Sequence, residues 1–99
     1  METFHTQKIN ANTRVRWVWD EMHETRGSYA YDTEEETKQA EDEELAKLAS
    51  GEWAALGMIV ETRCPHCAQW QQHESVWGVV IDANTDALDA FAAESGLLP

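Results

Sequence analysis

Basic residues are scarce in this sequence. Seven Lys and Arg stand against nineteen Asp and Glu, which gives a formal net charge of −12. A field of that sign repels nucleic acid, anionic membranes and acidic substrates, and it attracts cations and basic proteins. The charge therefore predicts no direct nucleic-acid binding and no membrane binding, and it makes a basic protein the expected class of partner.

Long apolar runs and distant cysteines are also lacking. No run of about eighteen apolar residues occurs, and the N-terminal stretch METFHTQKIN is too polar for the core of a signal peptide. Cys64 and Cys67, the two cysteines, lie too close together to join distant parts of a fold. We therefore expect a cytoplasmic protein in which residues 1–99 form a single domain.

Three segments have the pattern of β-strands. Arg14–Asp20 alternates, with Val and Trp on one side, which predicts a strand with one buried face. Trp53–Thr62 predicts a second strand. Ser75–Asp82 predicts a third, which is apolar on both faces and therefore suited to the middle of a sheet. Residues 21–32 lack a sustained period and predict a loop, in which Ser28–Tyr31 could form a short strand.

Two segments carry helix signals. Thr33 followed by Glu36 fits a capping box, and the acids after it suit the positive end of a helix dipole. A helix is therefore predicted over residues 33–50, and the glycine that follows can take the left-handed conformation that ends helices. A second helix is predicted to be capped by Asn84 or Thr85 and to close at Gly96.

The predicted order of elements is strand, helix, strand, strand, helix. The last two strands are expected to pair as an antiparallel hairpin, and a central third strand gives the sheet order 2-3-1. The first strand then runs parallel to the second and lies beside the third, after a right-handed crossover through the helix. The predicted fold class is α+β, with a three-stranded, mostly antiparallel sheet and two helices on one face.

Residues suited to redox chemistry or metal binding are concentrated in the segment RCPHCAQWQQHES, residues 63–75. It is expected to form a loop of about twelve residues between the second and third strands, longer than a hairpin usually needs. Cys64-Pro65-His66-Cys67 resembles the active-site motif of thioredoxin-fold disulfide oxidases, which implies a redox role. The scaffold of that family is missing, because the only other proline is the last residue, Pro99.

The same motif also resembles the metal-binding knuckle of rubredoxins and zinc ribbons. That resemblance implies zinc as a cofactor, with Cys64, Cys67 and His73 as metal ligands. The sequence departs from the pattern at Ala68, where that family usually has glycine, and it lacks a second Cys-x-x-Cys pair. A closed zinc site needs four ligands, and the fourth would come from His5, His23, Glu74, water or a second copy. An ordinary hairpin turn with two free thiols stays open as a third interpretation.

Motifs for catalysis are otherwise absent. No nucleophile with a base and an orienting group can be assembled, and there is no phosphate loop, dinucleotide turn or metalloprotease signature. We therefore expect that the protein is not an enzyme.

Acidic residues are concentrated in one part of the chain. Residues 20–44 contain eleven acids and two bases. Such a segment can simply be a solvated helix face that keeps the protein soluble, or it can imitate the phosphate spacing of DNA and occupy a basic cleft. On the second interpretation, the partner-binding residues are Glu34, Glu35, Glu41, Asp42, Glu43 and Glu44.

Three short segments carry a resemblance to a group of proteins. The GEW after the acidic helix, the GMIV of the second strand and the VWGVVID of the third look like small acidic proteins of unassigned function from actinobacterial phages and mobile elements. The resemblance covers about a third of the chain, assigns no site residues and implies a phage accessory protein that acts on a host protein.

These observations together predict a non-enzymatic phage-type accessory protein in the cytoplasm of a bacterial host. It would bind a basic, nucleic-acid-handling host protein as a DNA mimic or inhibitor, and it would be a monomer or a homodimer. The alternative prediction is a small zinc-binding or thiol redox module built on Cys64 and Cys67.

Overall fold

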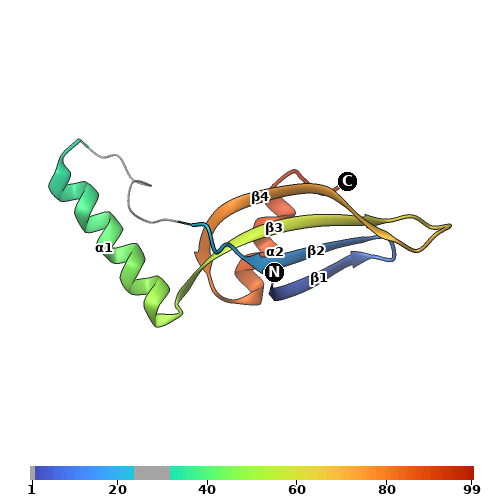
Figure 1. The fold of residues 1–99 in the computed structure, drawn as a ribbon, viewed down its shortest axis with the longest axis horizontal. Helices are drawn as coiled ribbons and strands as arrows, with labels where there is room; N and C mark the ends of the chain where they lie inside the picture. The colour runs from blue at the N-terminus through green and yellow to red at the C-terminus, as the bar shows by residue number, and fades with distance from the viewer. Residues whose placement is uncertain (1, 24–31) are drawn as a thin grey trace.

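The computed structural model describes residues 2–23 and 32–99. In these parts of the chain it has six elements, coloured along the sequence in Figure 1: β1 (Thr3–Asn10), β2 (Thr13–Trp19), α1 (Glu34–Ser50), β3 (Trp53–Arg63), β4 (Trp70–Asp82) and α2 (Thr85–Glu94). The α+β content agrees with the sequence prediction. The short strand considered at Ser28–Tyr31 lies outside the described residues.

The strands form one antiparallel sheet in the order β1-β2-β3-β4. The predicted three-stranded sheet with order 2-3-1 is therefore wrong. β2 and β3 are direct antiparallel neighbours, with Val15 opposite Val60 and Trp17 opposite Met58. The chain between them, including α1, is an excursion from one strand to its neighbour, so the expected parallel crossover is not formed.

A β-bulge explains why the sequence pattern of β4 wrongly predicts a central strand. Leu56 pairs with Val79 and Met58 pairs with Val76, so two residues of β4, Trp77 and Gly78, lie opposite one residue of β3. Gly78 has a φ of 72°, which a glycine adopts without strain. The extra residue shifts the alternation of side chains, and β4 looks apolar on both faces although it is an edge strand.

β1 was not predicted from the sequence. It pairs with β2 through the two-residue turn Ala11-Asn12, and the residues opposite the buried Trp17 and Val15 are the polar His5 and Gln7. Because these two side chains are polar, the segment lacks the apolar alternation that marks a half-buried strand. His5 Nε2 lies 3.3 Å from Asp89 Oδ1 of α2, which ties this edge of the sheet to the helix.

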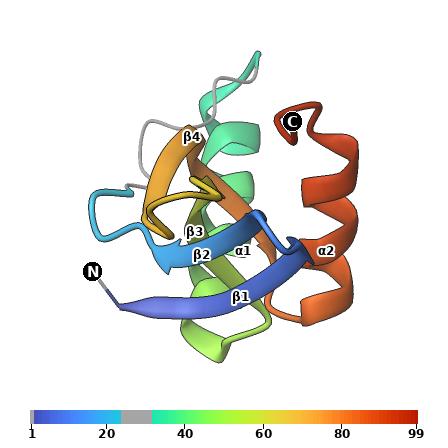
Figure 2. The same ribbon diagram turned by 90° about the vertical axis from the view of Figure 1, so that its right-hand side faces the viewer.

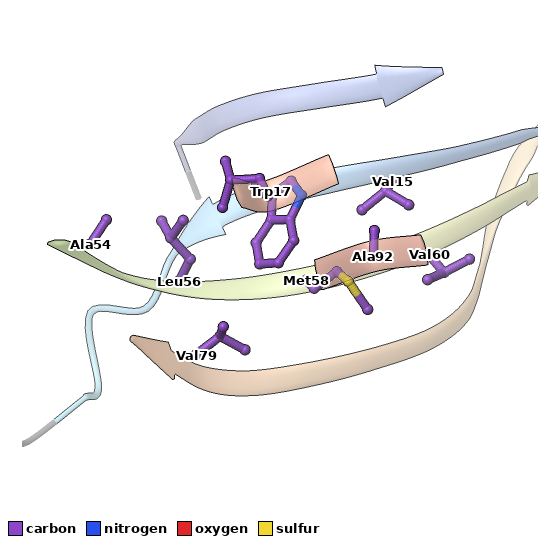
Figure 3. Close-up of a cluster of buried hydrophobic side chains, with 9 residues drawn as sticks. Val15, Trp17, Ala54, Leu56, Met58, Val60, Val79 and Ala92 are labelled. Carbon is purple, nitrogen blue, oxygen red and sulfur yellow. The ribbon is translucent and has the colours of Figure 1, made fainter. Parts of the chain in front are cut away.

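The core lies between one face of the sheet and α2. Figure 3 shows its side chains, which come from β2, β3, β4 and α2: Val15, Trp17, Ala54, Leu56, Met58, Val60, Val79, Leu88 and Ala92. Phe91 of α2 meets Trp17 edge-on, with ring centroids 5.7 Å apart. Asn84 Oδ1 caps α2 by accepting a bond from the Ala87 N–H at 2.8 Å, as expected from the sequence.

Of the two helices in residues 2–23 and 32–99, α2 alone covers this face, and neither helix lies on the opposite face of the sheet (Figure 2). The prediction that both helices cover one face is therefore wrong. α1 lies beyond the end of the sheet at which β3 begins, and it makes the molecule elongated, 55 × 24 × 23 Å (Figure 1). A hollow of about 610 Å³, lined by Trp19, Leu48 and Trp53 among others, separates α1 from that end.

The ends of α1 follow the sequence prediction. Thr33 Oγ1 accepts a hydrogen bond from the Glu36 N–H at 3.1 Å, and Gly51 closes the helix with a φ of 83° and an N–H bond to the Leu48 carbonyl. Neither α1 nor α2 has the length and apolar character that crossing a bilayer requires.

Candidate functional site

The acidic residues of α1 divide into an exposed and a buried group. Four of the six predicted partner-binding residues are exposed: Glu34, Glu35, Asp42 and Glu43. Glu41 and Glu44 are buried, with only 8% and 2% of their surface accessible. The described structure thus offers a row of carboxylates to a partner, but a shorter one than the sequence indicates.

Glu44 has a structural contact that accounts for its burial. Its Oε2 lies 3.4 Å from Nε2 of His23, and both side chains are largely shielded from water. A buried carboxylate is tolerated only where polar groups satisfy it. Because Glu44 is buried against His23, its side chain helps to attach α1 to the segment that follows β2.

The loop that carries the two cysteines is shorter than predicted. β3 extends to Arg63 and β4 begins at Trp70, so the loop is Cys64–Gln69. The Cys64 carbonyl accepts a hydrogen bond from the Ala68 N–H at 2.9 Å, and the Cys64 N–H donates to the Gln69 carbonyl at 3.2 Å. Ala68 has a φ of 58°, a left-handed conformation that glycine would adopt more easily, at the position where zinc knuckles usually have glycine.

The turn lowers the pKa of the Cys64 thiol. Hydrogen bonds from the backbone N–H of Cys67, then from the Cys67 thiol, then from the backbone N–H of His66 lower the pKa of Cys64, while its slight desolvation opposes them. Neither thiol is in a disulfide; Cys64 is partly exposed and Cys67 is exposed at the hairpin tip. The arrangement favours a thiolate at Cys64.

His73 does not join the two cysteines. It is an exposed residue of β4, and no group of three His, Cys, Asp or Glu side chains within residues 2–23 and 32–99 is arranged to hold a metal ion. The structure therefore brings together two of the three predicted zinc ligands and leaves the third apart.

A basic cluster that the sequence did not predict lies on the uncovered face of the sheet. Lys8 of β1 is opposite Arg14 of β2, and Arg14 is opposite Glu61 of β3, so these side chains share one face. Arg16 and Arg63 lie on the same face by strand alternation. We call Lys8, Arg14, Arg16 and Arg63 the basic face; it holds four of the seven basic residues of the chain.

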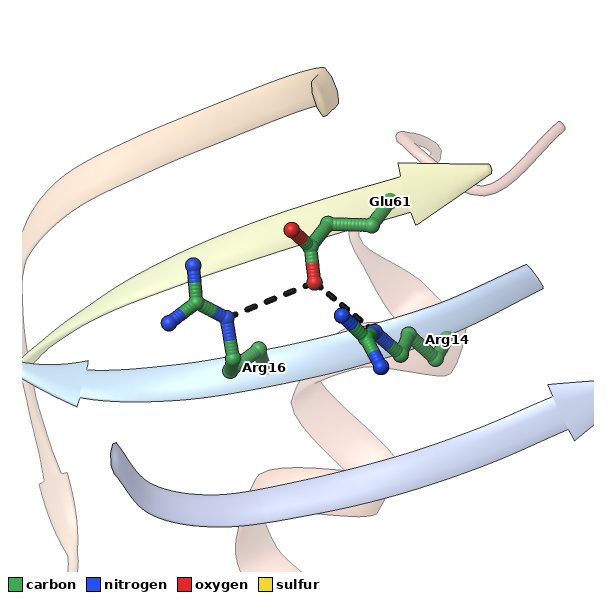
Figure 4. A network of polar contacts seen from close by, with 3 residues as sticks. All are labelled: Arg14, Arg16 and Glu61. Atoms are coloured by element: carbon green, nitrogen blue, oxygen red, sulfur yellow. Dashed lines mark hydrogen bonds and ion pairs between the residues drawn. The ribbon is translucent and has the colours of Figure 1, made fainter. Parts of the chain in front are cut away.

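Glu61 and Trp70 hold the arginines of this face in place. Arg14 Nε donates to Glu61 Oε1 at 2.8 Å and Arg16 Nε to the same oxygen at 3.3 Å (Figure 4). The guanidinium carbon of Arg14 lies 4.1 Å from the centroid of the Trp70 ring, and that of Arg63 lies 5.4 Å from it. Beside them is a hollow of about 310 Å³, lined by Thr6, Lys8, Ala11, Arg14, Arg63 and Trp70.

Only part of this cluster had a signal in the sequence. Arg14 and Arg16 alternate with the buried residues of β2, which predicts that they share a face. Lys8 lies in β1, which the sequence did not predict, and the sequence prediction placed Arg63 in a loop.

Comparisons of the chain with protein-family models, with curated proteins and with solved structures find no match.

Proposed function

We propose that this protein is a non-enzymatic binding protein that uses the exposed carboxylates of α1 to dock on a basic, nucleic-acid-handling protein of a bacterial host. The observation that carries the proposal is the position of α1, which extends beyond the sheet with Glu34, Glu35, Asp42 and Glu43 exposed (Figure 1). A helix with seven acids and two bases that protrudes from its domain can enter a cleft.

The physical basis is electrostatic. A single exposed ion pair contributes about 0–1 kcal/mol, so one carboxylate would add little. A row of carboxylates on a rigid helix raises the local potential and speeds association with a basic surface, and it competes with phosphates for the same Lys and Arg side chains. The protein would then act as an inhibitor or DNA mimic, in keeping with the phage context that the GEW, GMIV and VWGVVID segments imply.

The experiment compares two variants of equal charge. In the first, the exposed acids of α1 are neutralised: E34Q, E35Q, D42N and E43Q. In the control, exposed acids elsewhere are neutralised: E2Q, E74Q, D86N and E94Q. Each variant loses four carboxylates, so the formal net charge of both changes from −12 to −8.

Each protein is immobilised and exposed to host lysate, and captured basic proteins are then tested for displacement of bound DNA. We expect the wild type and the control variant to retain the same basic protein and to displace DNA from it, and the α1 variant to lose both properties. Equal behaviour of the two variants would show that total charge, and not the α1 surface, is responsible.

A second candidate function is a metal or thiol module at the Cys64–Gln69 turn, with zinc as the cofactor. It is favoured by the amide hydrogen bonds to Cys64, which are the environment that a thiolate ligand needs. Elemental analysis of protein purified without chelators tests it. Bound zinc that is lost in C67S supports the zinc-binding form of the module, and protein without zinc contradicts that form.

A further inference from the structure

Charge is separated along the long axis of the molecule. α1 carries seven acids and two bases and lies beyond the beginning of β3. The basic face includes Arg63 at the end of β3, ten residues after Trp53 and therefore about 34 Å away along the strand. This distance is several Debye lengths at physiological salt, so each end of the molecule acts through its own local charge and not through the net −12.

The basic face is organised to receive carboxylates. Glu61 accepts hydrogen bonds from Nε of Arg14 and Nε of Arg16. The terminal N–H groups of both guanidinium groups therefore stay available to a ligand. Stacking on Trp70 fixes the plane of Arg14 and reduces the entropy that binding would cost. Lys8 and Arg63 have no ion-pair partner within the described residues, and they are the two cations at the rim of the face.

We propose that two copies of this chain form a two-fold dimer in which the exposed carboxylates of α1 of one copy lie on the basic face of the other. The size of the two surfaces agrees: the basic face spans three strands, about 10 Å, which is the diameter of one helix. Because the acidic and basic surfaces lie at opposite ends, an antiparallel arrangement of two copies forms both contacts at once and closes the assembly.

Single-stranded nucleic acid is the other polyanion that a basic sheet face could bind. That binding relies on aromatic rings that are free to stack on bases. Trp70 lines the hollow beside Lys8, Arg14 and Arg63, and Arg14 already covers its ring at 4.1 Å. Trp77, which is on the same face, lies against Gly57, four residues along β3 from Glu61. The geometry therefore favours carboxylates, and the protein carries a preformed row of them on α1.

The dimer uses the surface of α1 that we assign to a host partner, but it does not depend on that partner. Two charge-reversal variants separate the contacts. K8E/R63E alters the basic face and leaves α1 intact. E36K/E43K alters exposed residues seven positions apart, on one side of α1, and leaves the basic face intact.

The measurement is molar mass by light scattering after size exclusion, with a reductant present so that Cys67 cannot form disulfides. In about 50 mM salt the wild type should have a mass of about 23 kDa, twice the 11.3 kDa of the chain, and in about 500 mM salt that of one chain. Each variant alone should have the mass of one chain. Their 1:1 mixture should regain the mass of two, because one intact α1 then meets one intact basic face.

Three results would overturn the dimer: a wild type that is a single chain at low salt, a variant that still dimerises alone, or a mixture that stays monomeric although both variants keep the circular dichroism of the wild type. Binding of a labelled single-stranded DNA of about 20 nucleotides to the wild type, lost in K8E/R63E, would assign the face to nucleic acid instead. K8E/R63E should also keep the host partner proposed above, so failure of the dimer and failure of that function are separable.

Discussion

Arg14 donates from Nε to Oε1 of Glu61 at 2.8 Å, and this one oxygen also receives Nε of Arg16. The Glu61 side chain is only 11% exposed, while the two arginines are about a third exposed. A single carboxylate thus neutralises part of the charge of two cations on the uncovered face of the sheet. It both stabilises β2 against β3 and sets the direction in which the free guanidinium donors point.

Glu61→Gln should therefore lower stability more than an ordinary surface change. The substitution keeps the shape of the side chain and removes the charge that two arginine donors share, so we expect a loss of about 1–3 kcal/mol in the free energy of unfolding. Urea denaturation followed by tryptophan fluorescence measures it. Glu74→Gln, an exposed change on the neighbouring strand β4, is the control and should stay within about 0.5 kcal/mol of the wild type.

Gly57→Ala should be destabilising because of Trp77. The bulge in β4 turns Trp77 onto the uncovered face, where its ring lies so close to Gly57 that an added Cβ would overlap it. We expect a loss of about 1–3 kcal/mol from this overpacking. In a Trp77→Ala background the same Gly57→Ala change should cost clearly less, and an equal cost in both backgrounds would show that the ring is not the cause.

The same bulge shows which features of the fold could be predicted from the sequence and which could not. Helix caps depend on a few neighbouring residues, and the predictions at Thr33 and Asn84 are confirmed. The sheet order depends on pairing between distant segments. The sequence prediction relied on the apolar character of both faces of Ser75–Asp82. Strict alternation would put Trp77 and Val79 on one face, but the bulge puts them on opposite faces, so the predicted order is wrong.

The candidate sites were predictable to the extent that they are local. The two thiols of one turn and the exposed acids of one helix lie within short segments. The burial of Glu44 depends on His23, twenty-one residues away, and the basic face joins residues of three strands through pairing. Alternation within β2 predicts the common face of Arg14 and Arg16, but nothing local in the sequence predicts that Lys8 and Arg63 join them.

Neighbouring acids of α1 should respond differently to neutralisation. Glu44 is buried with its carboxylate 3.4 Å from His23, whereas Glu43 is exposed and has a weak contact of 3.7 Å with Lys47. Glu44→Gln should cost about 1–3 kcal/mol in the free energy of unfolding, and Glu43→Gln less than about 0.5 kcal/mol. Thermal and urea unfolding of the two variants measure this difference, and equal costs would contradict the structural role of Glu44.

Alkylation should detect the stabilised thiolate of Cys64. Hydrogen bonds from the Cys67 N–H, the Cys67 thiol and the His66 N–H stabilise the Cys64 thiolate, so the pKa of Cys64 lies below its ordinary value. A lowered pKa means that the thiolate is present at lower pH. At neutral pH, Cys64 should therefore react with iodoacetamide faster in the folded protein than in the denatured chain, and the midpoint of its rate against pH should lie below that of the denatured chain.

Cys67→Ala removes one of the three donors, the thiol, and keeps both backbone N–H groups. It should move the midpoint for Cys64 upward without restoring that of an unstructured peptide. Rates are obtained by mass spectrometry of peptides after timed alkylation, with the same protein in denaturant as the reference. A midpoint for Cys64 in the folded protein at or above that of the denatured chain would show that the turn does not stabilise the thiolate, and the second candidate function would lose its physical basis.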